Sequence, residues 1–173
     1  MTFQKRIKAL LFILVSVSLL TSCSITKELN IKSETKKEIE TMMELIQNED
    51  TDELIKHFSP DVTDIHNDFL VKEIEQLYFY LDGKILSYDE PTDTGYSQEA
   101  VDYGHIKLYR SNPDVENVET QDGRLLTFSF SYTVIDEKNS EHVGINQILI
   151  FTQNDNGSLD ELQLDIDGLS DDE

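Results

Sequence analysis

The fold of this chain is decided by one stretch, Leu126-Thr127-Phe128-Ser129-Phe130-Ser131-Tyr132-Thr133-Val134. Large apolar residues alternate with hydroxyl residues along it, and a period of two is the spacing of a β-strand that buries one face. The aromatic side is predicted to face a core, and the other side to be rich in hydroxyl groups. Asp122-Gly123 just before it is a two-residue hairpin signal. We therefore predict a long strand over 124–135, paired with a weaker strand at 115–120.

Further strands are predicted on both sides of this hairpin. The period of two occurs at 84–88 and 103–109 before it and at 143–152 after it. Because 143–152 is apolar on both faces, we expect it in the middle of the sheet. The acidic C-terminal region has the composition of a disordered tail, but apolar and polar residues alternate over 159–167. This region is predicted to be a strand that returns along 143–152 through a turn at 154–157.

The chain before Gly83 has helical periodicity instead. Capping boxes beginning at Thr35 and Asp50 predict the starts of two helices, and Pro60 is predicted to end the second one. A third helix is predicted over 67–81, with Gly83 at the position where a left-handed C-cap is commonly needed. Three N-terminal helices packed on an antiparallel sheet of five to six strands make an α+β fold.

The segment where helices give way to strands resembles a known family. Phe79-Tyr80-Leu81-Asp82-Gly83-Lys84-Ile85-Leu86-Ser87-Tyr88-Asp89 is similar to a characteristic segment of the bacterial lipoprotein family called domain of unknown function 5104. Leu54 to Pro60 and Asp136 to Ile145 resemble two further segments, so the likeness covers 33–152. The resemblance implies a surface lipoprotein with a curved, cone-shaped sheet of the nuclear transport factor 2-like (cystatin-like) kind. It brings no catalytic residues.

The N-terminus has the layout of a lipoprotein signal. Lys5, Arg6 and Lys8 precede an apolar run from Ala9 to Leu20, and Leu20-Thr21-Ser22-Cys23 closes it. The run is shorter than the ~20 apolar residues that a membrane-spanning helix needs. Cys23 is the one cysteine of the chain, which suits a lipid acceptor and excludes an internal disulfide. An ordinary secretory signal, cut elsewhere, stays open as the alternative.

Four parts of the chain follow from these patterns. They are a signal peptide at 1–22, a tether at 23–32, a single α+β domain at 33–168 and a disordered acidic end at 169–173. Lipid on Cys23 would hold the mature chain at the extracytoplasmic face of the cell membrane, because two or more acyl chains anchor a protein stably.

The chain is strongly acidic, with 14 Lys and Arg against 35 Asp and Glu and a formal net charge of −21. Removing 1–22 removes three basic residues and no acidic ones, so the mature chain reaches −24. Such a surface repels phosphates, which excludes nucleic acid as a partner. Cationic partners are favoured electrostatically, although a solvated acidic surface needs no partner.

The sequence contains no complete motif of a known active centre. Gly95-Tyr96-Ser97-Gln98-Glu99 begins like a nucleophile elbow but has glutamate where the second glycine is needed. There is no phosphate-binding loop or paired-histidine zinc motif, and the turn at 154–157 lacks the first and last acids of a calcium loop. A calcium site there is the weaker alternative to a plain turn. We predict no catalytic residue, no cofactor and no metal.

Four residues are predicted to line a ligand pocket between the third helix and the sheet. Tyr103, His105 and Tyr109 share one face of a predicted strand, and Tyr78 widens the apolar face of the third helix. Each combines an apolar body with a polar tip, which suits orienting a ligand. The alternative is that His105 is an ordinary sheet histidine and that the tyrosines pack in the core.

Together these features predict a membrane-anchored extracytoplasmic lipoprotein that acts as a non-enzymatic binding module for an unknown ligand or protein partner. Two alternatives stay open. One is a small acid–base enzyme that uses the cone cavity, with His105 and a nearby acid as the pair. The other is an acidic immunity-type protein that captures cationic peptides at the membrane.

Overall fold

The computed structural model describes residues 30–92, 98–103, 105–154 and 157–169. The chain divides into two compact units, 1–34 and 35–173. In the first unit only residues 30–34 are described, and they are helical. The signal segment, Cys23 and most of the predicted tether therefore lie outside the described residues. None of the described helices is long and apolar enough to span a membrane.

The second unit begins with helical residues 35–47. The buried face of this helix is the predicted one, formed by Ile39, Met42, Met43 and Ile46. Thr35 is helical and buried rather than an N-cap, so the capping box predicted there is wrong. The cap fails because residues 30–34 before it are helical as well, which leaves no free first-turn amides for the Thr35 hydroxyl.

The helix α2, Thr51–Ile55, begins at its predicted cap. The Asp50 carboxylate accepts a hydrogen bond from the Glu53 N–H at 3.3 Å, which satisfies one amide of the first turn. The start predicted from this capping pattern is confirmed.

The helix α3, Pro60–Leu81, begins at Pro60 rather than at Asn67. The prediction that Pro60 ends the preceding helix is wrong, because proline fits the first helical position, where no N–H donor is needed. The backbone leaves helical geometry at His66 (φ −125°, ψ 17°), so α3 is kinked beside the predicted start.

The C-cap of α3 is Asp82, one residue before Gly83, where the cap was predicted. Asp82 is left-handed (φ 43°) and donates its N–H to the Tyr78 carbonyl, and Gly83 follows. Arg124 Nη2 donates to the carbonyl oxygens of Tyr80 at 2.7 Å and Leu81 at 3.2 Å. The last helical carbonyls are therefore satisfied from the strand side of the domain.

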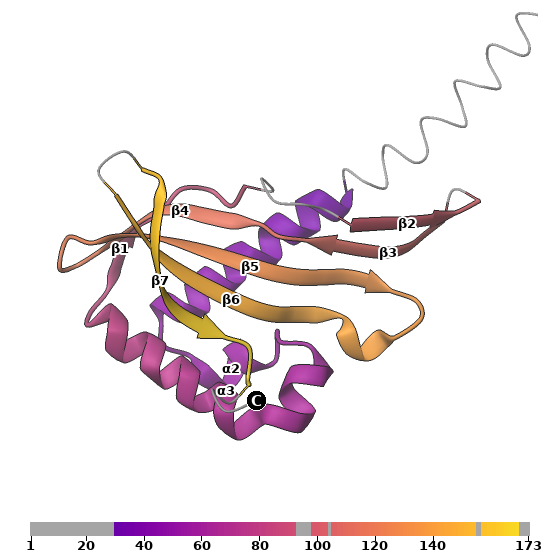
Figure 1. Cartoon of the computed structure of the whole chain (residues 1–173), viewed down its shortest axis with the longest axis horizontal. Coiled ribbons are helices and arrows are strands. Elements are labelled where there is room, and N and C mark those ends of the chain that lie inside the picture. The colour runs from indigo at the N-terminus through magenta and orange to yellow at the C-terminus, as the bar shows by residue number, and fades with distance from the viewer. Residues whose placement is uncertain (1–29, 93–97, 104, 155–156, 170–173) are drawn as a thin grey trace, which may run out of the picture. The chain divides into compact units, whose positions relative to one another are not determined.

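Seven strands form one antiparallel sheet (Figure 1). Their bounds are β1 Ile85–Ser87, β2 Gln98–Asp102, β3 His105–Ser111, β4 Asp114–Thr120, β5 Leu125–Asp136, β6 Gly144–Gln153 and β7 Leu159–Ile166. β4 pairs with the first half of β5 and β3 with its second half, whereas β6 pairs along the other edge of β5 and β7 pairs with β6. A 3-10 helix, η1 Ser140–His142, lies between β5 and β6.

Five of these strands, β1, β4, β5, β6 and β7, lie where the sequence predicts them. The antiparallel return of β7 along β6 is confirmed, so residues Leu159–Ile166 of the acidic C-terminal region form a strand of the sheet. The strand expected at 103–109 is β3, displaced to His105–Ser111. β2 has no counterpart in the prediction, because its apolar residues are only Ala100-Val101 and give no alternation. The sheet therefore has seven strands rather than five to six.

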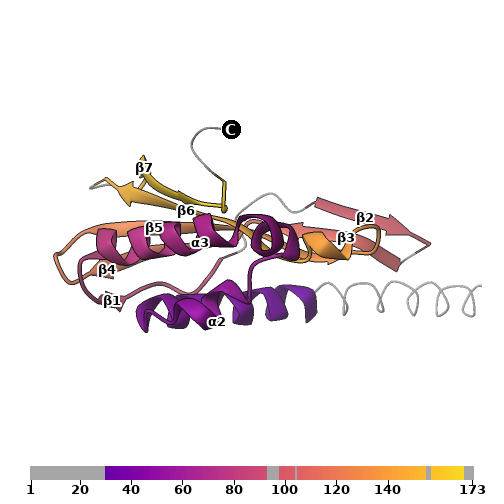
Figure 2. The same ribbon diagram turned by 90° about the horizontal axis from the view of Figure 1, so that it is seen from below.

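The core lies on the predicted aromatic side of β5. Leu126, Phe128 and Phe130 are at most 1 % exposed and belong to the same cluster as Leu70 and Ile74 of α3. Figure 2 shows the sheet edge-on, with α2 on one side of β4 and β5. Burial of these side chains supplies the main favourable term for the fold.

The hydroxyl side of β5 is partly buried too. Thr127 Oγ1 accepts a hydrogen bond from Gln153 Nε2 at 2.7 Å, and Thr133 Oγ1 accepts one from Asn146 Nδ2 at 3.0 Å. Both threonines are buried, and these side-chain amides from β6 satisfy their hydroxyl groups. The second face of the sheet is thus a polar surface whose side chains form hydrogen bonds with one another.

Candidate functional site

Three β-bulges occur at the end of the sheet that carries β2 and η1. The extra residues are Lys107 on β3 opposite β2, Val134 on β5 opposite β3, and Asn146 on β6 opposite β5. A bulge turns the residues beyond it toward the other face of the strand, and bulges recur next to binding sites for this reason. The regular alternation of β5 therefore stops at this end of the sheet.

The bulges place side chains from three strands in one row. Ala100 of β2 lies opposite Leu108 of β3, and Leu108 lies opposite Asp136 at the end of β5. Cross-strand partners share a face, so two apolar residues lie next to a carboxylate. This row forms the floor of a pocket.

Two neighbouring pockets open on this face. The groove has a volume of about 460 Å³ and is lined by Ala100, Val101, Asp102, Lys107, Leu108, Asp136, Lys138, Asn139 and His142. The side pocket has a volume of about 240 Å³ and is lined by Arg110, Ser131, Thr133, His142 and Asn146. His142 lines both, so its imidazole lies between them.

The imidazole of His142 has three polar neighbours. Its Nδ1 lies 3.0 Å from Asp136 Oδ2, and its Nε2 lies 3.0 Å from Asp61 Oδ2 in the first turn of α3. Asn139 Nδ2 lies 2.8 Å from the same Nε2, while Asn139 Oδ1 accepts from the Glu141 N–H. A proton on Nε2 would suit Asp61, and a lone pair would suit Asn139. His142 thus connects η1 with both β5 and α3.

Asp136 is held in its charged form. Hydrogen bonds from His142 and from the backbone N–H groups of Asn139 and Lys138 lower the pKa of this carboxyl group below its ordinary value. Arg110 Nη2 lies 3.9 Å from the same carboxylate. The hydrogen-bonding capacity of Asp136 is therefore used within the loop that closes the groove.

The basic residues of the groove differ in their partners. Lys107 Nζ donates to Asp102 Oδ2 at 2.7 Å. The Lys138 ammonium group makes no ion pair or side-chain hydrogen bond with any residue that the structure describes. Lys138 is exposed, on the turn between β5 and η1.

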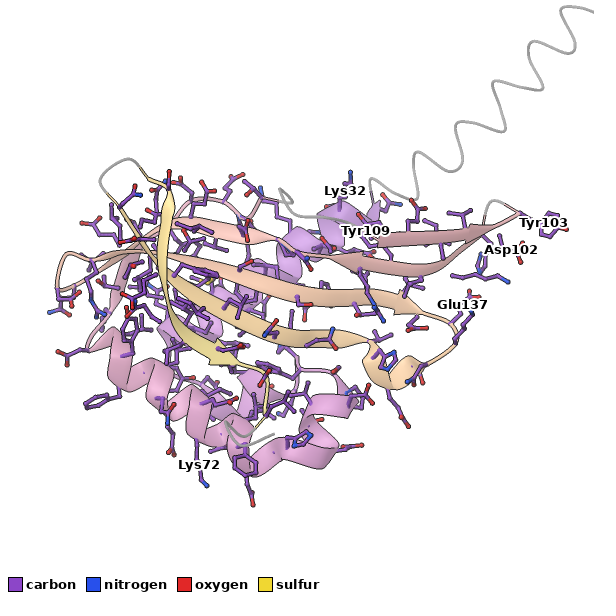
Figure 3. All side chains as sticks on the ribbon, viewed as in Figure 1. Lys32, Lys72, Asp102, Tyr103, Tyr109 and Glu137 are labelled. Atoms are coloured by element: carbon purple, nitrogen blue, oxygen red, sulfur yellow. The ribbon has the colours of Figure 1, made fainter. Side chains whose placement is uncertain are left out.

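The structure does not bring together the four residues predicted to form a pocket. Tyr103 is fully exposed at the tip of the β2–β3 hairpin, where Figure 3 shows it pointing away from the sheet, and Tyr109 is buried farther along β3. His105 is exposed and pairs with Glu137, and Tyr78 is half-buried on α3. None of the four lines the groove or the side pocket.

This outcome corrects the predicted site, and the cause is local. The chain turns at Tyr103, which is left-handed (φ 49°), so this residue is not part of a strand. The bulge at Lys107 also breaks the predicted row on β3, because Tyr109 lies on the side opposite Leu108 whereas His105 lies on the same side as Leu108.

The residues that the sequence-based reasoning missed lie in one short connection. Asp136, Asn139 and His142 follow each other at intervals of three between two strong strands. Asx residues at such spacing favour local turns and a helix cap, and Asn139 is indeed the cap of η1. That signal could have placed an ordered polar loop here.

Within the ranges that the structure describes, no group of three or more His, Cys, Asp or Glu residues is placed to hold a metal ion. The weaker calcium alternative at the turn 154–157 involves 155–156, which lie outside those ranges. The same holds for most of the segment Gly95 to Glu99 and for the lipid acceptor Cys23.

The comparisons with known proteins give one family. A search of the curated proteins finds no match. The family model described as a domain of unknown function (DUF5104) matches residues 41–153, which is more than half of the chain. All residues that line the groove and the side pocket lie within this match. The chain belongs to the family described as a domain of unknown function (DUF5104).

Proposed function

We propose that this protein is a lipid-anchored extracytoplasmic binding module that holds a small ligand in the groove between β2, β3 and η1. The observation that carries the proposal is the groove itself, about 460 Å³ in volume with an apolar floor and a polar rim. Ligand sites of small molecules have volumes of about 300–1,000 Å³ and combine apolar walls with a few placed polar groups.

The floor of the groove supports this function. Ala100 is exposed and lies opposite Leu108 on the same face of the sheet. Leu108 is half-buried on the neighbouring strand. When an apolar part of a ligand covers water-exposed apolar side chains, the free energy falls, which favours binding.

A titration of the ¹⁵N-labelled chain with a library of small fragments, followed by amide chemical shifts, tests the proposal. Bound fragments should shift the amides of β2, β3 and η1. Ala100→Trp should fill the groove and abolish these shifts, whereas Leu86→Trp, at an exposed position of β1, should leave them. Shifts that persist in Ala100→Trp, or a library without any groove binder, would contradict the proposal.

The cellular location is a second part of the proposal, supported by the order of basic, apolar and small residues before Cys23. Expression in a bacterial host should give a membrane-bound chain that begins at Cys23 and carries acyl groups. The Cys23→Ser protein should be lost from the membrane fraction, whereas the Ser24→Ala protein should remain in it. A Cys23→Ser chain that stays in the membrane fraction without lipid mass would refute lipidation.

We also propose that the fold is of the nuclear transport factor 2-like kind. Support comes from the long strand β5, Leu125–Asp136, which carries a bulge at Val134 in its second half and packs with its apolar face in the same core as α3.

A second candidate is acid–base catalysis, because His142 lines both pockets and its Nδ1 lies 3.0 Å from Asp136 Oδ2 in the groove. This replaces the pair centred on His105, which is exposed beside Glu137. His142 Nε2 is already close to Asp61 and Asn139, which makes binding the better-supported function. Turnover of ester, phosphate or glycoside probe substrates that disappears in His142→Gln but not in His66→Gln would favour the enzyme.

A further inference from the structure

The charged groups of the groove are unequally satisfied. Asp102 is paired with Lys107 at 2.7 Å, and Asp136 accepts from His142 and from two backbone N–H groups. Lys138 is the lining residue whose charge has no partner among the described residues. A ligand that enters the groove therefore meets an available positive charge and no available negative one.

The charge of the whole chain makes this local excess selective. With a formal net charge of −21, most of the surface attracts cations, so a cationic ligand needs no built site. An anion needs a local positive group to overcome that field. The groove and the side pocket carry Lys107, Arg110 and Lys138 against Asp102 and Asp136, so their lining has more basic than acidic residues although the chain as a whole is acidic.

The apolar floor sets the second requirement. Ala100 and Leu108 lie on the β2–β3 hairpin, and Lys138 lines the groove from the β5–η1 turn, two residues after Asp136. A ligand that satisfies both needs a charged end and a short apolar body. One available ammonium group matches a single negative charge, whereas a phosphate dianion is commonly held by several cations or an Arg fork.

On the basis of the function proposed above, we infer that the groove binds a monoanionic amphiphile, a carboxylate on a short apolar chain. The carboxylate lies at Lys138, and the chain covers Ala100 and Leu108. No bond is made or broken, so the groove acts as a binding site alone.

Three probes of one chain length separate the contributions of charge and apolar surface. Sodium hexanoate, hexanol and hexylammonium chloride are titrated into the ¹⁵N-labelled chain, with amide shifts as the measurement. Hexanoate should bind most tightly of the three and shift the amides of β2, β3 and η1. Hexyl phosphate, as a fourth arm, should not bind more tightly than hexanoate.

Matched variants test the two ends of the ligand. Lys138→Gln should weaken hexanoate binding about three- to fivefold, the range of an exposed ion pair, and leave hexanol unchanged. Lys84→Gln, an exposed lysine outside the groove, is the control. Leu108→Ser should weaken hexanoate and hexanol alike, whereas Leu159→Ser, at an exposed position of β7 outside the groove, should not.

The outcomes distinguish this inference from the proposed function. Equal binding of hexanol and hexanoate in the groove would overturn the anionic ligand while keeping the binding module. Tighter binding of hexylammonium or hexyl phosphate would overturn it as well. A hexanoate affinity that Lys138→Gln leaves unchanged would remove the assigned role of that ammonium group.

Discussion

The two halves of β5 differ although they belong to one strand. In the first half the alternation of β5 itself is regular, because the bulge in its pairing with β4 lies on β4, and Leu126, Phe128 and Phe130 are at most 1 % exposed. In the second half, bulges interrupt the pairing with β3 and β6, and Asp136 turns toward the groove. A strict period of two buries one face completely, whereas a broken period brings polar groups to a common surface.

The difference teaches where stability and function lie in this domain. The regular half carries the large buried side chains, whose contacts are shared with α3 and β6. In the bulged half the polar groups satisfy each other, as the hydrogen bonds of Asp136 and Asn139 show. Substitutions in the first half should therefore cost more free energy of unfolding than substitutions in the second.

The largest effect is expected for Phe128→Ala, in the middle of the regular half. Phe128 is 0 % exposed, and removing its ring leaves a cavity, so the free energy of unfolding should fall by about 3–5 kcal/mol. Urea denaturation measures the change. Phe79→Ala on α3, where the ring is 88 % exposed, is the control and should stay within about 0.5 kcal/mol of the wild type. Similar losses in both variants would mean that β5 does not organise the core.

The next effect tests whether the regular region extends to β7, which lies beyond the family match. Ile166 is 0 % exposed opposite Ile148 of β6, and Ile166→Ala should cost about 2–4 kcal/mol. Leu162→Ala should cost less than about 1 kcal/mol, because Leu162 is 47 % exposed. An Ile166→Ala chain with an unchanged urea midpoint would indicate a weakly attached acidic tail rather than a strand.

The same contrast explains what the sequence could predict. The alternation of β5 and β7 and the cap at Asp50 are local patterns with one physical meaning, and the structure confirms them. Pro60 is ambiguous, because proline both ends helices and begins them, and the choice depends on the chain around it. β2 is too short and polar to leave a pattern.

The groove could not be predicted from periodicity. Its floor depends on a bulge whose extra residue, Lys107, follows no marker such as glycine or proline in the sequence. A row that assumes unbroken alternation selects Tyr103, His105 and Tyr109 and misses Leu108. The contact between His142 Nε2 and Asp61 Oδ2 could not be predicted either, because the two residues are far apart in the sequence and only the fold brings them together.

A third prediction tests the close approach of β6 and the residues before α3, where Gly144 lies against the Ser59 backbone. Gly144 has φ +134°, and a Cβ there would lie 2.7 Å from the Ser59 backbone nitrogen. Gly144→Ala should therefore cost about 1–3 kcal/mol through strain and displacement of that backbone. Gly123→Ala, with φ +86° but open space around it, should cost less. Equal urea midpoints for the two variants would mean that the close approach at Ser59 is not needed.

The smallest effects concern two carboxyl groups with opposite pKa shifts. Hydrogen bonds from His142 and backbone N–H groups lower the pKa of Asp136, so its charge stabilises the fold above its ordinary pKa. This contribution is lost as the pH falls through the lowered pKa. Burial raises the pKa of Asp165 on β7, and Asp167 adds to the shift, so its charge opposes folding at neutral pH. That opposition is relieved as the pH falls through the raised pKa.

The two substitutions should therefore have opposite signs. Near pH 7, urea denaturation should show a lower free energy of unfolding for Asp136→Asn than for the wild type. For Asp165→Asn the free energy of unfolding should be unchanged or higher by up to about 0.5 kcal/mol. The difference for Asp165→Asn should shrink as the pH falls through its raised pKa, whereas the difference for Asp136→Asn should shrink only at lower pH, as the pH falls through its lowered pKa. Asp160→Asn, at an exposed position of β7, serves as the control. A rise in stability for Asp136→Asn near pH 7 would mean that the bulged end stores strain in its polar network, and the contrast between the two halves of β5 would then be one of strain rather than of burial.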